Sequence, residues 1–176
     1  LKELRISVYW FIVMSSKERK AMKLGILLTD HVMDKLRVTH GDMADFYEYI
    51  FGKVDSSISL KIFEVVDGVY PKNIDECQGY LITGSRFSVY DEVDWIKRLK
   101  IFVLELHQLK KPLIGVCFGH QLIAQVLGGE AKEAESGWTI GNQTYNFAED
   151  LPWIKRDDSS VKLLHSHKDQ VTQLPP

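Results

Sequence analysis

Cysteine is scarce in this sequence: the 176 residues contain only Cys77 and Cys117, in unrelated contexts. Two lone thiols form neither a disulfide framework nor a cysteine-rich metal site, so we expect a reducing, cytoplasmic setting. An excess of basic residues is also lacking, because 22 Lys and Arg stand against 24 Asp and Glu. A surface with this balance cannot neutralise a phosphate backbone well, which argues against nucleic acid as a partner.

The chain has no apolar run of the length that a membrane span needs. Residues 6–13 (ISVYWFIV) are apolar, but eight residues are too few to cross a bilayer. The charged SSKERK comes soon after them, where a signal peptide would have a small-residue cleavage site. We therefore expect no membrane contact. Residues 1–21 are interpreted as an extension outside the fold, with a native interaction helix as the alternative, and residues 22–176 as a single domain.

Patterns that bind metals or phosphate groups are missing as well. The six histidines are scattered, and His31, His40 and His107 are interpreted as solvated or packing side chains. The glycines near Cys117 match neither a mononucleotide phosphate loop nor the dinucleotide-binding spacing. The sequence therefore predicts neither a metal nor a cofactor.

Short apolar runs alternate with helical patterns along the first 129 residues. The runs typical of buried strands are 23–29, 60–66, 80–83 and 113–116. Apolar residues at helical spacing occur over 43–51, 91–111 and 120–127. This alternation predicts an α/β fold of three layers, a mainly parallel sheet with helices on both faces. Beyond residue 130 the pattern changes, and segments 138–147 and 161–164 are predicted to be β-structure.

Cys117 stands in a glycine-bracketed turn, G-V-C-F-G, between a predicted strand and a predicted helix. Such a turn matches a nucleophile elbow, which exposes the central side chain at the carboxyl edge of a sheet. Gly115 and Gly119 relieve the crowding where the two backbones approach each other. The helix N-terminus favours thiolate over thiol. We predict that Cys117 is a nucleophile; the alternative is a small buried hydrophobic residue, the usual fate of a free cysteine.

Residues 115–129 (GVCFGHQLIAQVLGG) resemble the nucleophile segment of class I glutamine amidotransferases, typically G-[IV]-C-x-G-x-Q before a Leu- and Ala-rich helix and Gly-Gly. The resemblance implies the flavodoxin-like fold of that family and a Gln121 that contacts the bound glutamine. It also implies that the N–H after the cysteine, here on Phe118, is one donor of the oxyanion hole.

The second oxyanion donor of the family comes from a Ser-Gly-Gly-Pro-like loop after a strand. Residues 80–86 (YLITGSR) resemble that region, which implies a backbone donor at Ser85 with Gly84 as its flexible neighbour. Ser and Arg replace the second Gly and the Pro of the family form. A backbone donor tolerates serine, and the alternative is an ordinary turn at the end of a strand.

Two further segments resemble the same family. Residues 135–141 (ESGWTIG) lie where members hold the α-amino and α-carboxylate groups of glutamine, which implies roles for Gly137 and Trp138. Residues 165–171 (HSHKDQV) resemble the S-H-x-D-x-V segment in the glutaminase part of GMP synthase.

The His-x-Glu pair that supplies the family's catalytic base occurs nowhere in the 176 residues. We therefore expect a chain that is incomplete at its C-terminal end and that turns over glutamine poorly as it stands. His167 together with Asp169 is the alternative source of a base.

The resemblance implies a glutaminase in which Cys117 attacks the side-chain amide of L-glutamine and forms a γ-glutamyl thioester. The ammonia released would pass to an acceptor, and the candidate recipient is a synthase partner chain. Three alternatives stay open. They are hydrolysis or transfer of γ-glutamyl groups from other amides or peptides, a non-catalytic partner that keeps the pocket without the base, and a different cysteine enzyme with an elbow on a similar sheet.

Overall fold

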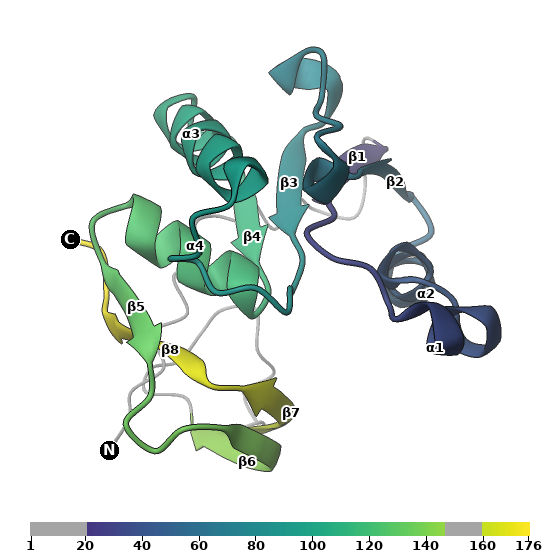
Figure 1. Cartoon of the computed structure of the whole chain (residues 1–176). Coiled ribbons are helices and arrows are strands. Elements are labelled where there is room, and N and C mark those ends of the chain that lie inside the picture. The colour runs from purple at the N-terminus through teal and green to yellow at the C-terminus, as the bar shows by residue number, and fades with distance from the viewer. Residues whose placement is uncertain (1–20, 147–159) are drawn as a thin grey trace.

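The computed structural model describes residues 21–146 and 160–176. Its main sheet has four parallel strands in the order β2-β1-β3-β4 (Figure 1). These strands are β1 (Met22–Leu27), β2 (Ile58–Phe63), β3 (Gly79–Ile82) and β4 (Leu113–Gly115). The predicted α/β fold with a parallel sheet is confirmed. Strand β2 ends earlier than predicted, because Val65–Asp67 form a 3-10 turn.

Helices cover both faces of this sheet, as predicted (Figure 1). They are α1 (Asp34–His40), α2 (Met43–Val54), α3 (Asp94–Gln108) and α4 (Phe118–Val126), with a second 3-10 turn at Ile74–Glu76. Strand side chains alternate between two cores, since successive residues of a strand point to opposite faces. Those in the larger core, with α3 and α4, include Leu27, Tyr80 and Ile82. Those in the smaller core are Leu24, Ile26 and Leu81.

Helix α3 closes the larger core with one stripe of side chains. Its buried residues, at the three- and four-residue spacing of one helical face, are Ile96, Leu99, Val103 and Leu106. Each such side chain contributes about 1.5–3 kcal/mol of transfer free energy when fully buried. Trp95 and Phe102 pack beside them and are partly buried. The predicted inner face of this helix is therefore confirmed.

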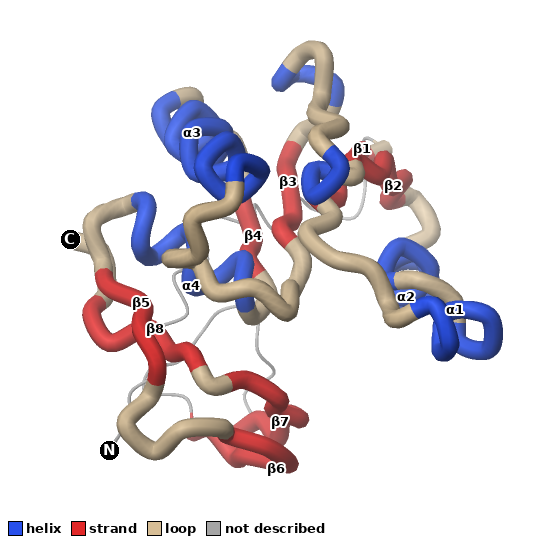
Figure 2. Tube along the Cα trace, viewed as in Figure 1, coloured by secondary structure: helices blue, strands red, loops and turns tan. Residues whose placement is uncertain are grey.

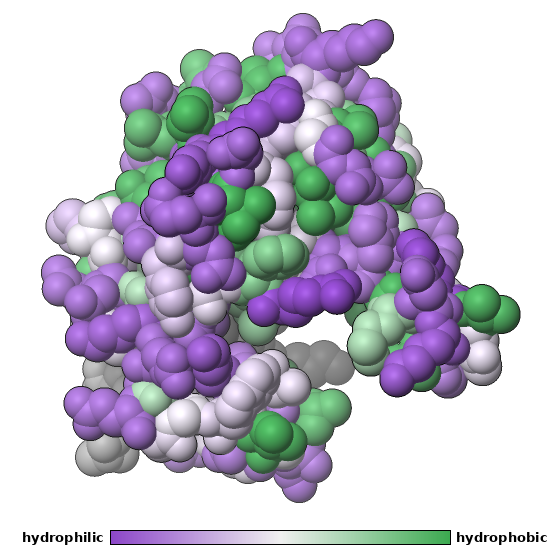
Figure 3. All heavy atoms as spheres, in the orientation of Figure 1, coloured by the Kyte–Doolittle hydropathy of each residue, from purple (hydrophilic) through white to green (hydrophobic). Residues whose placement is uncertain are grey.

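Helix α2 covers the opposite face of the sheet more sparsely. Asp42 caps its first turn in a reciprocal arrangement with Asp45. Only Tyr47 and Phe51 reach the smaller core, whereas other apolar side chains of the helix remain in solvent. Figure 3 shows apolar surface at this end of the molecule. The short helix α1 before it was not predicted.

Two antiparallel strand pairs follow the parallel sheet (Figure 2). One consists of β6 (Thr139–Asn146) and β7 (Ser160–His167), which confirms the predicted β-structure there. The other consists of β5 (Glu130–Glu133) and β8 (Asp169–Gln173), which were not predicted. The proposed extension, apart from Ala21, lies outside the described residues. None of the helices in the described ranges is both long and apolar enough to span a membrane.

Candidate active site

Cys117 lies in the tight turn between β4 and α4, with φ 51° and ψ -108°. A positive φ is rare for a residue with a Cβ, and such backbone strain clusters at functional sites. The turn leaves the residue exposed at the N-terminus of the helix. The predicted strand-turn-helix geometry is therefore present, and the alternative of a buried, packing cysteine is wrong for this residue.

The two glycines around the turn are required by close packing. A Cβ added to Gly115 would lie 2.4 Å from the carbonyl carbon of Gly119. A Cβ added to Gly119 would lie 2.5 Å from the carbonyl oxygen of Ile82, at the end of β3. Since real Cβ contacts are longer than these, the glycines allow β3, β4 and α4 to meet at Cys117.

The loop after β3 borders the thiol. A Cβ added to Gly84 would lie 3.6 Å from the Cβ of Cys117, which is ordinary van der Waals contact. The hydroxyl of Ser85 donates to the Thr29 carbonyl at 3.0 Å and accepts from the Phe87 N–H at 3.3 Å. The N–H of Ser85 itself has no acceptor among the described residues. The side chain thus holds the loop while the N–H stays available as a donor.

Arg86, which stands where the family form has proline, fixes the same loop. Its Nε lies 2.9 Å and its Nη2 2.8 Å from the two carboxyl oxygens of Asp30, whose Oδ2 also accepts from the Arg86 N–H at 2.8 Å. Burial alone would raise the pKa of Asp30. The hydrogen bonds from Arg86 and from the His31 N–H, with the charge of Arg86, outweigh burial and lower it. The departure from the family form therefore adds an anchor.

Replacing Asp30 by asparagine is expected to lower the free energy of unfolding at pH 7 by about 1.5–3 kcal/mol, the usual value for hydrogen bonds to a charged group. Because the folded protein holds the Asp30 pKa below its unfolded value, this contribution is complete above that unfolded value. It is lost as the pH falls through the folded pKa. Urea unfolding at pH 7 and at acidic pH should therefore show a difference between variant and wild type that shrinks in acid.

The matched control is Glu92→Gln, which removes an exposed ion pair with Lys97. This control should leave the unfolding midpoint unchanged, since exposed pairs contribute little. An Asp30→Asn variant as stable as wild type at pH 7 would show that the anchor has no structural importance.

The environment of the thiol opposes ionisation. Desolvation by the surrounding protein raises the pKa of Cys117, the N–H of Phe118 lowers it, and the negative charge of Asp169 raises it further. The net effect is a raised pKa of the Cys117 thiol. The N–H of Phe118, at the helix N-terminus, acts in the expected direction and favours the thiolate, but burial and the charge of Asp169 outweigh it.

Alkylation of Cys117 by iodoacetamide should consequently be slow at neutral pH and accelerate with a midpoint above that of free cysteine, about 8.5. The measurement is the alkylation rate against pH for the 176-residue chain. Cys77 is fully buried and provides the internal control, because it should react only when the protein unfolds. A midpoint below neutrality would contradict the description of the site.

His167 is not placed to act as the base. Its Nδ1 lies 2.9 Å from the carbonyl oxygen of Asp169, and a carbonyl only accepts, so Nδ1 has the proton. Its Nε2 then accepts from the Nδ1 of His165 at 2.8 Å. Both ring nitrogens are therefore engaged away from the sulfur. Within the described parts of the chain, no histidine, including His120 of α4, forms a hydrogen bond with the Cys117 thiol.

Gln121 lies buried on α4, one turn after the cysteine. Its Nε2 donates to the carbonyl oxygen of Asp169 at 2.9 Å. Its Oε1 forms no hydrogen bond with the described residues, which leaves that atom for a ligand. The substrate contact implied by the family resemblance stays a prediction.

Gly137 and Trp138 lie in the turn between β5 and β6. The Gly137 N–H donates to the Ala134 carbonyl at 2.8 Å, and Trp138 is 62% exposed. In the described part of the chain, neither residue has a hydrogen bond or ring contact with Cys117 or Gln121. The structure thus places the loop at Gly84 beside Cys117 but shows no contact of Gly137 or Trp138 with the cysteine. The role of these two residues in binding the substrate stays a prediction.

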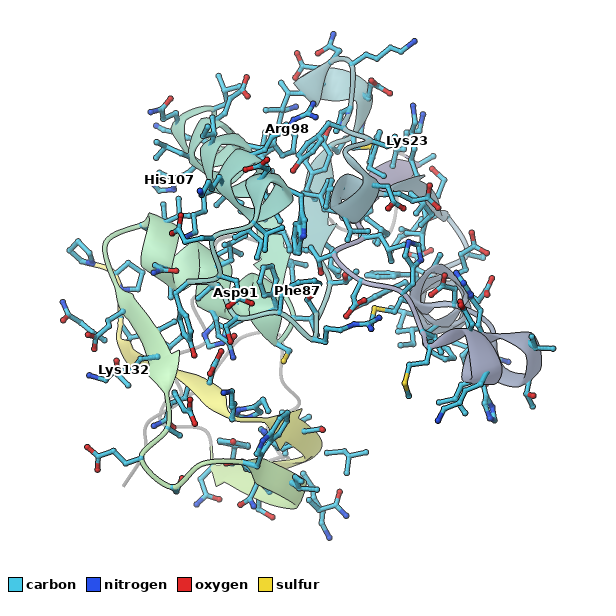
Figure 4. All side chains as sticks on the ribbon, viewed as in Figure 1. Lys23, Phe87, Asp91, Arg98, His107 and Lys132 are labelled. Carbon is cyan, nitrogen blue, oxygen red and sulfur yellow. The ribbon has the colours of Figure 1, made fainter. Side chains whose placement is uncertain are left out.

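Two contacts near the site were missed from the sequence, although Asp169 itself was named there together with His167. Burial raises the pKa of Tyr47 of α2, and the negative charge of Cys117 raises it further. Asp169 is buried and binds side chains of the loop between β3 and α3. Figure 4 shows this loop beside α4, with Phe87 and Asp91 labelled. Their partners are far apart in the sequence, so no local pattern predicted either contact.

A metal site is not formed by the residues that the structure describes. Among these residues, no three or more His, Cys, Asp or Glu side chains are grouped so that they could hold a metal ion.

Comparisons with known proteins agree with this geometry. The sequence model of the family described as glutamine amidotransferase class-I matches residues 62–176. Gamma-glutamyl peptidase 3 of Arabidopsis thaliana is 28% identical over 172 residues, which are 93% of this chain and 67% of that protein. One subunit of the glutamine-hydrolysing GMP synthase of Sulfolobus acidocaldarius is 28% identical over 129 residues, 73% of this chain and 66% of that protein.

Solved structures show the same fold. The crystal structure of a glutamine amidotransferase from Thermotoga maritima superposes with a TM-score of 0.72 at 18% identity, covering 89% of this chain and 64% of that one. The chain thus spans about two thirds or less of the length of the proteins it resembles, as in gamma-glutamyl peptidase 4 of Arabidopsis thaliana, where it covers 57%.

Proposed function

Because this chain belongs to the class-I glutamine amidotransferase family, we propose that Cys117 is the nucleophile that attacks the γ-carbonyl group of L-glutamine or of a γ-glutamyl compound. The observation that supports this most directly is the exposed, positive-φ cysteine at the N-terminus of α4. Among the described residues, neither side-chain packing nor a side-chain hydrogen bond to another side chain gives a reason for a strained cysteine at that position.

The proposed reaction proceeds through a thioester. The Cys117 thiolate adds to the carbonyl carbon, and the carbonyl oxygen becomes an oxyanion. The N–H groups of Phe118 and Ser85 are the proposed donors to that oxyanion, an interaction worth about 3 kcal/mol per donor in comparable enzymes. Collapse breaks the C–N bond, the leaving nitrogen takes a proton to leave as ammonia or an amine, and water then hydrolyses the thioester to glutamate.

The base for these proton transfers is proposed to lie outside the 176 residues. No His-x-Glu pair occurs in them, and both nitrogens of His167 are already hydrogen-bonded. With a raised thiol pKa and no histidine on the sulfur, the 176-residue chain by itself should turn over glutamine poorly. The alternative of a non-catalytic protein applies only if the full-length protein also lacks a His-x-Glu pair.

Glutamine hydrolysis and γ-glutamyl peptide hydrolysis differ only in the leaving group. The similarity to a gamma-glutamyl peptidase over 93% of the chain supports the peptide substrate as the second candidate. The similarity to one chain of a GMP synthase supports a synthase partner that receives ammonia. The two unpaired cysteines support a reducing, cytoplasmic location.

Protection of Cys117 from iodoacetamide distinguishes these substrates. L-Glutamine, a γ-glutamyl dipeptide and L-asparagine are each added at increasing concentration, and the alkylation rate at Cys117 is followed by mass spectrometry. Protection by glutamine supports the glutaminase, and protection by the dipeptide alone supports the peptidase. L-Asparagine is one methylene shorter and should protect little. The same rate with all three compounds would refute the proposed substrate class.

A further inference from the structure

The carboxyl group of Asp169, at the start of β8, is buried with 5% of the residue exposed. Among the described residues, no lysine, arginine or histidine forms an ion pair with it. A buried carboxyl group is costly unless hydrogen bonds replace its water. An aspartate at this position therefore needs a reason beyond filling space.

Both carboxyl oxygens of Asp169 bind hydroxyl groups of the loop between β3 and α3. The Ser88 hydroxyl donates to Oδ2 at 2.5 Å, and the Tyr90 hydroxyl donates to Oδ1 at 3.0 Å. The loop is stiffened further where the Ser88 N–H donates to Asp91 at 2.9 Å. Asp169 thus holds this loop from the β8 side.

The same loop begins with the proposed oxyanion donor. Ser85 is followed at once by Arg86, which Asp30 anchors, and then by Ser88 and Tyr90, which Asp169 anchors. The two buried carboxyl groups of Asp30 and Asp169 therefore fix the segment that determines the position of the Ser85 N–H. Since an oxyanion hole depends on preorganised donors, the stiffness of this segment affects the transition state directly.

The backbone of Asp169 holds a second part of the site. Its carbonyl oxygen accepts from the Gln121 amide at 2.9 Å and from His167 Nδ1 at 2.9 Å. Through its pairing with Glu133 of β5, the residue is also held in the antiparallel pair. One residue therefore connects the loop at Ser85, the Gln121 side chain and the β5–β8 pair.

We infer that Asp169 is a positioning residue for the γ-glutamyl reaction: its carboxyl group fixes the loop that contains Ser85, and its carbonyl fixes the Gln121 side chain. This inference rests on the proposed function of Cys117. The negative charge of Asp169 disfavours the thiolate, so the residue is not explained as an activator of the nucleophile. Asp169 instead contributes by fixing the positions of the groups that bind the substrate.

The test compares two reagents that react with the same sulfur in the full-length protein. Diazo-oxo-norleucine must bind as a glutamine analogue before it alkylates Cys117, whereas iodoacetamide needs no binding site. The ratio of the two rates therefore reports the positioning of the substrate groups. The variants are Asp169→Asn, which keeps the shape and the carbonyl contacts, and Ser88→Ala with Tyr90→Phe, which keeps the carboxyl group.

Both variants should lower the ratio by about 10-fold to 100-fold, the usual effect of small displacements at a reacting centre. Hydrogen exchange of the amides of residues 84–91 should become faster in both. In Asp169→Asn the pH midpoint of iodoacetamide alkylation should also fall, because the variant removes a negative charge that raises the pKa of Cys117. Tyr47 of α2, another titratable group that interacts with this sulfur by charge, is the same in variant and wild type. The shift of the midpoint follows from the lost charge alone, so the positioning role is judged from the ratio of the two rates, which a purely structural role would leave unchanged.

The matched control is Glu133→Gln. Glu133 lies opposite Asp169 on β5, and its replacement removes the same charge, but the side chain is exposed and its ion pair among the described residues is with Lys168. The ratio of this control should equal that of the wild type. A wild-type ratio in both test variants would overturn the inference. Failure of the proposed function would be visible separately, as a wild-type protein whose Cys117 diazo-oxo-norleucine does not label.

Discussion

Replacing Cys117 by serine is expected to reduce γ-glutamyl amide cleavage by the full-length protein by about 10³-fold or more. Serine fits the same turn, but its hydroxyl is a far weaker nucleophile than a thiolate and has no adjacent base among the described residues. The exposed side chain loses little packing, so the temperature of unfolding should stay nearly constant. The measurements are the rate of glutamate release and a thermal unfolding curve.

Cys77→Ala is the matched control for this prediction. Cys77 is buried in the larger core, and burial raises its pKa. Its replacement should reduce stability through a small cavity while the cleavage rate per folded molecule is retained. A Cys117→Ser variant with the wild-type rate would remove the cysteine from the mechanism. A Cys77→Ala variant that folds but has lost activity would place the nucleophile elsewhere.

Replacing Gly119 by alanine is expected to lower the free energy of unfolding by about 3 kcal/mol, because the new methyl group would meet a backbone oxygen and not a movable side chain. The methyl carbon would lie 2.5 Å from the Ile82 carbonyl oxygen and 2.7 Å from the Ile82 Cβ. Relief requires that α4 move away from β3, which would displace Cys117 as well. Urea unfolding followed by circular dichroism measures the loss.

Gly52→Ala provides the opposite case. Gly52 lies in α2, and an added Cβ there meets nothing within 4 Å. Alanine should therefore stabilise the protein by about 0.5–1 kcal/mol through the lower entropy of the unfolded chain. Equal effects of the two substitutions would mean that the contact between α4 and β3 is not as tight as the structure indicates.

The parts of the fold that the sequence predicts are those encoded in local patterns. The apolar runs at β1 and β3 and the apolar face of α3 follow from the spacing of neighbouring residues, because a strand or helix buries one face or both. The turn at Cys117 was predictable for the same reason, since its glycines lie within four residues of each other. The structure adds the clashes that make those glycines necessary.

The parts that could not be predicted depend on residues far apart in the chain. The pair Asp30–Arg86 joins positions 56 residues apart, and the bond between Ser88 and Asp169 joins positions 81 residues apart. Strands β5 and β8 are short and polar and are defined by pairing with each other. The balance of the Cys117 pKa depends on burial and on a distant carboxyl group, neither of which a motif expresses.

Histidine roles show the same limit. His31 was interpreted as solvated or packing, yet its Nδ1 lies 2.7 Å from Asp42, the cap of α2. Desolvation alone would lower the pKa of His31, but Asp42 and Asp67 outweigh it and raise the pKa. His167 looked available from its sequence context, and only the structure shows that both of its nitrogens are engaged.

The most direct measurement of the central claim is the site at which diazo-oxo-norleucine modifies the wild-type full-length protein. After digestion, mass spectrometry should find the adduct on the peptide that contains Cys117, and L-glutamine or a γ-glutamyl dipeptide should slow its formation. Cys77 should stay unmodified, since it is fully buried. Active protein without an adduct at Cys117, or with an adduct that no γ-glutamyl compound slows, would contradict the assignment.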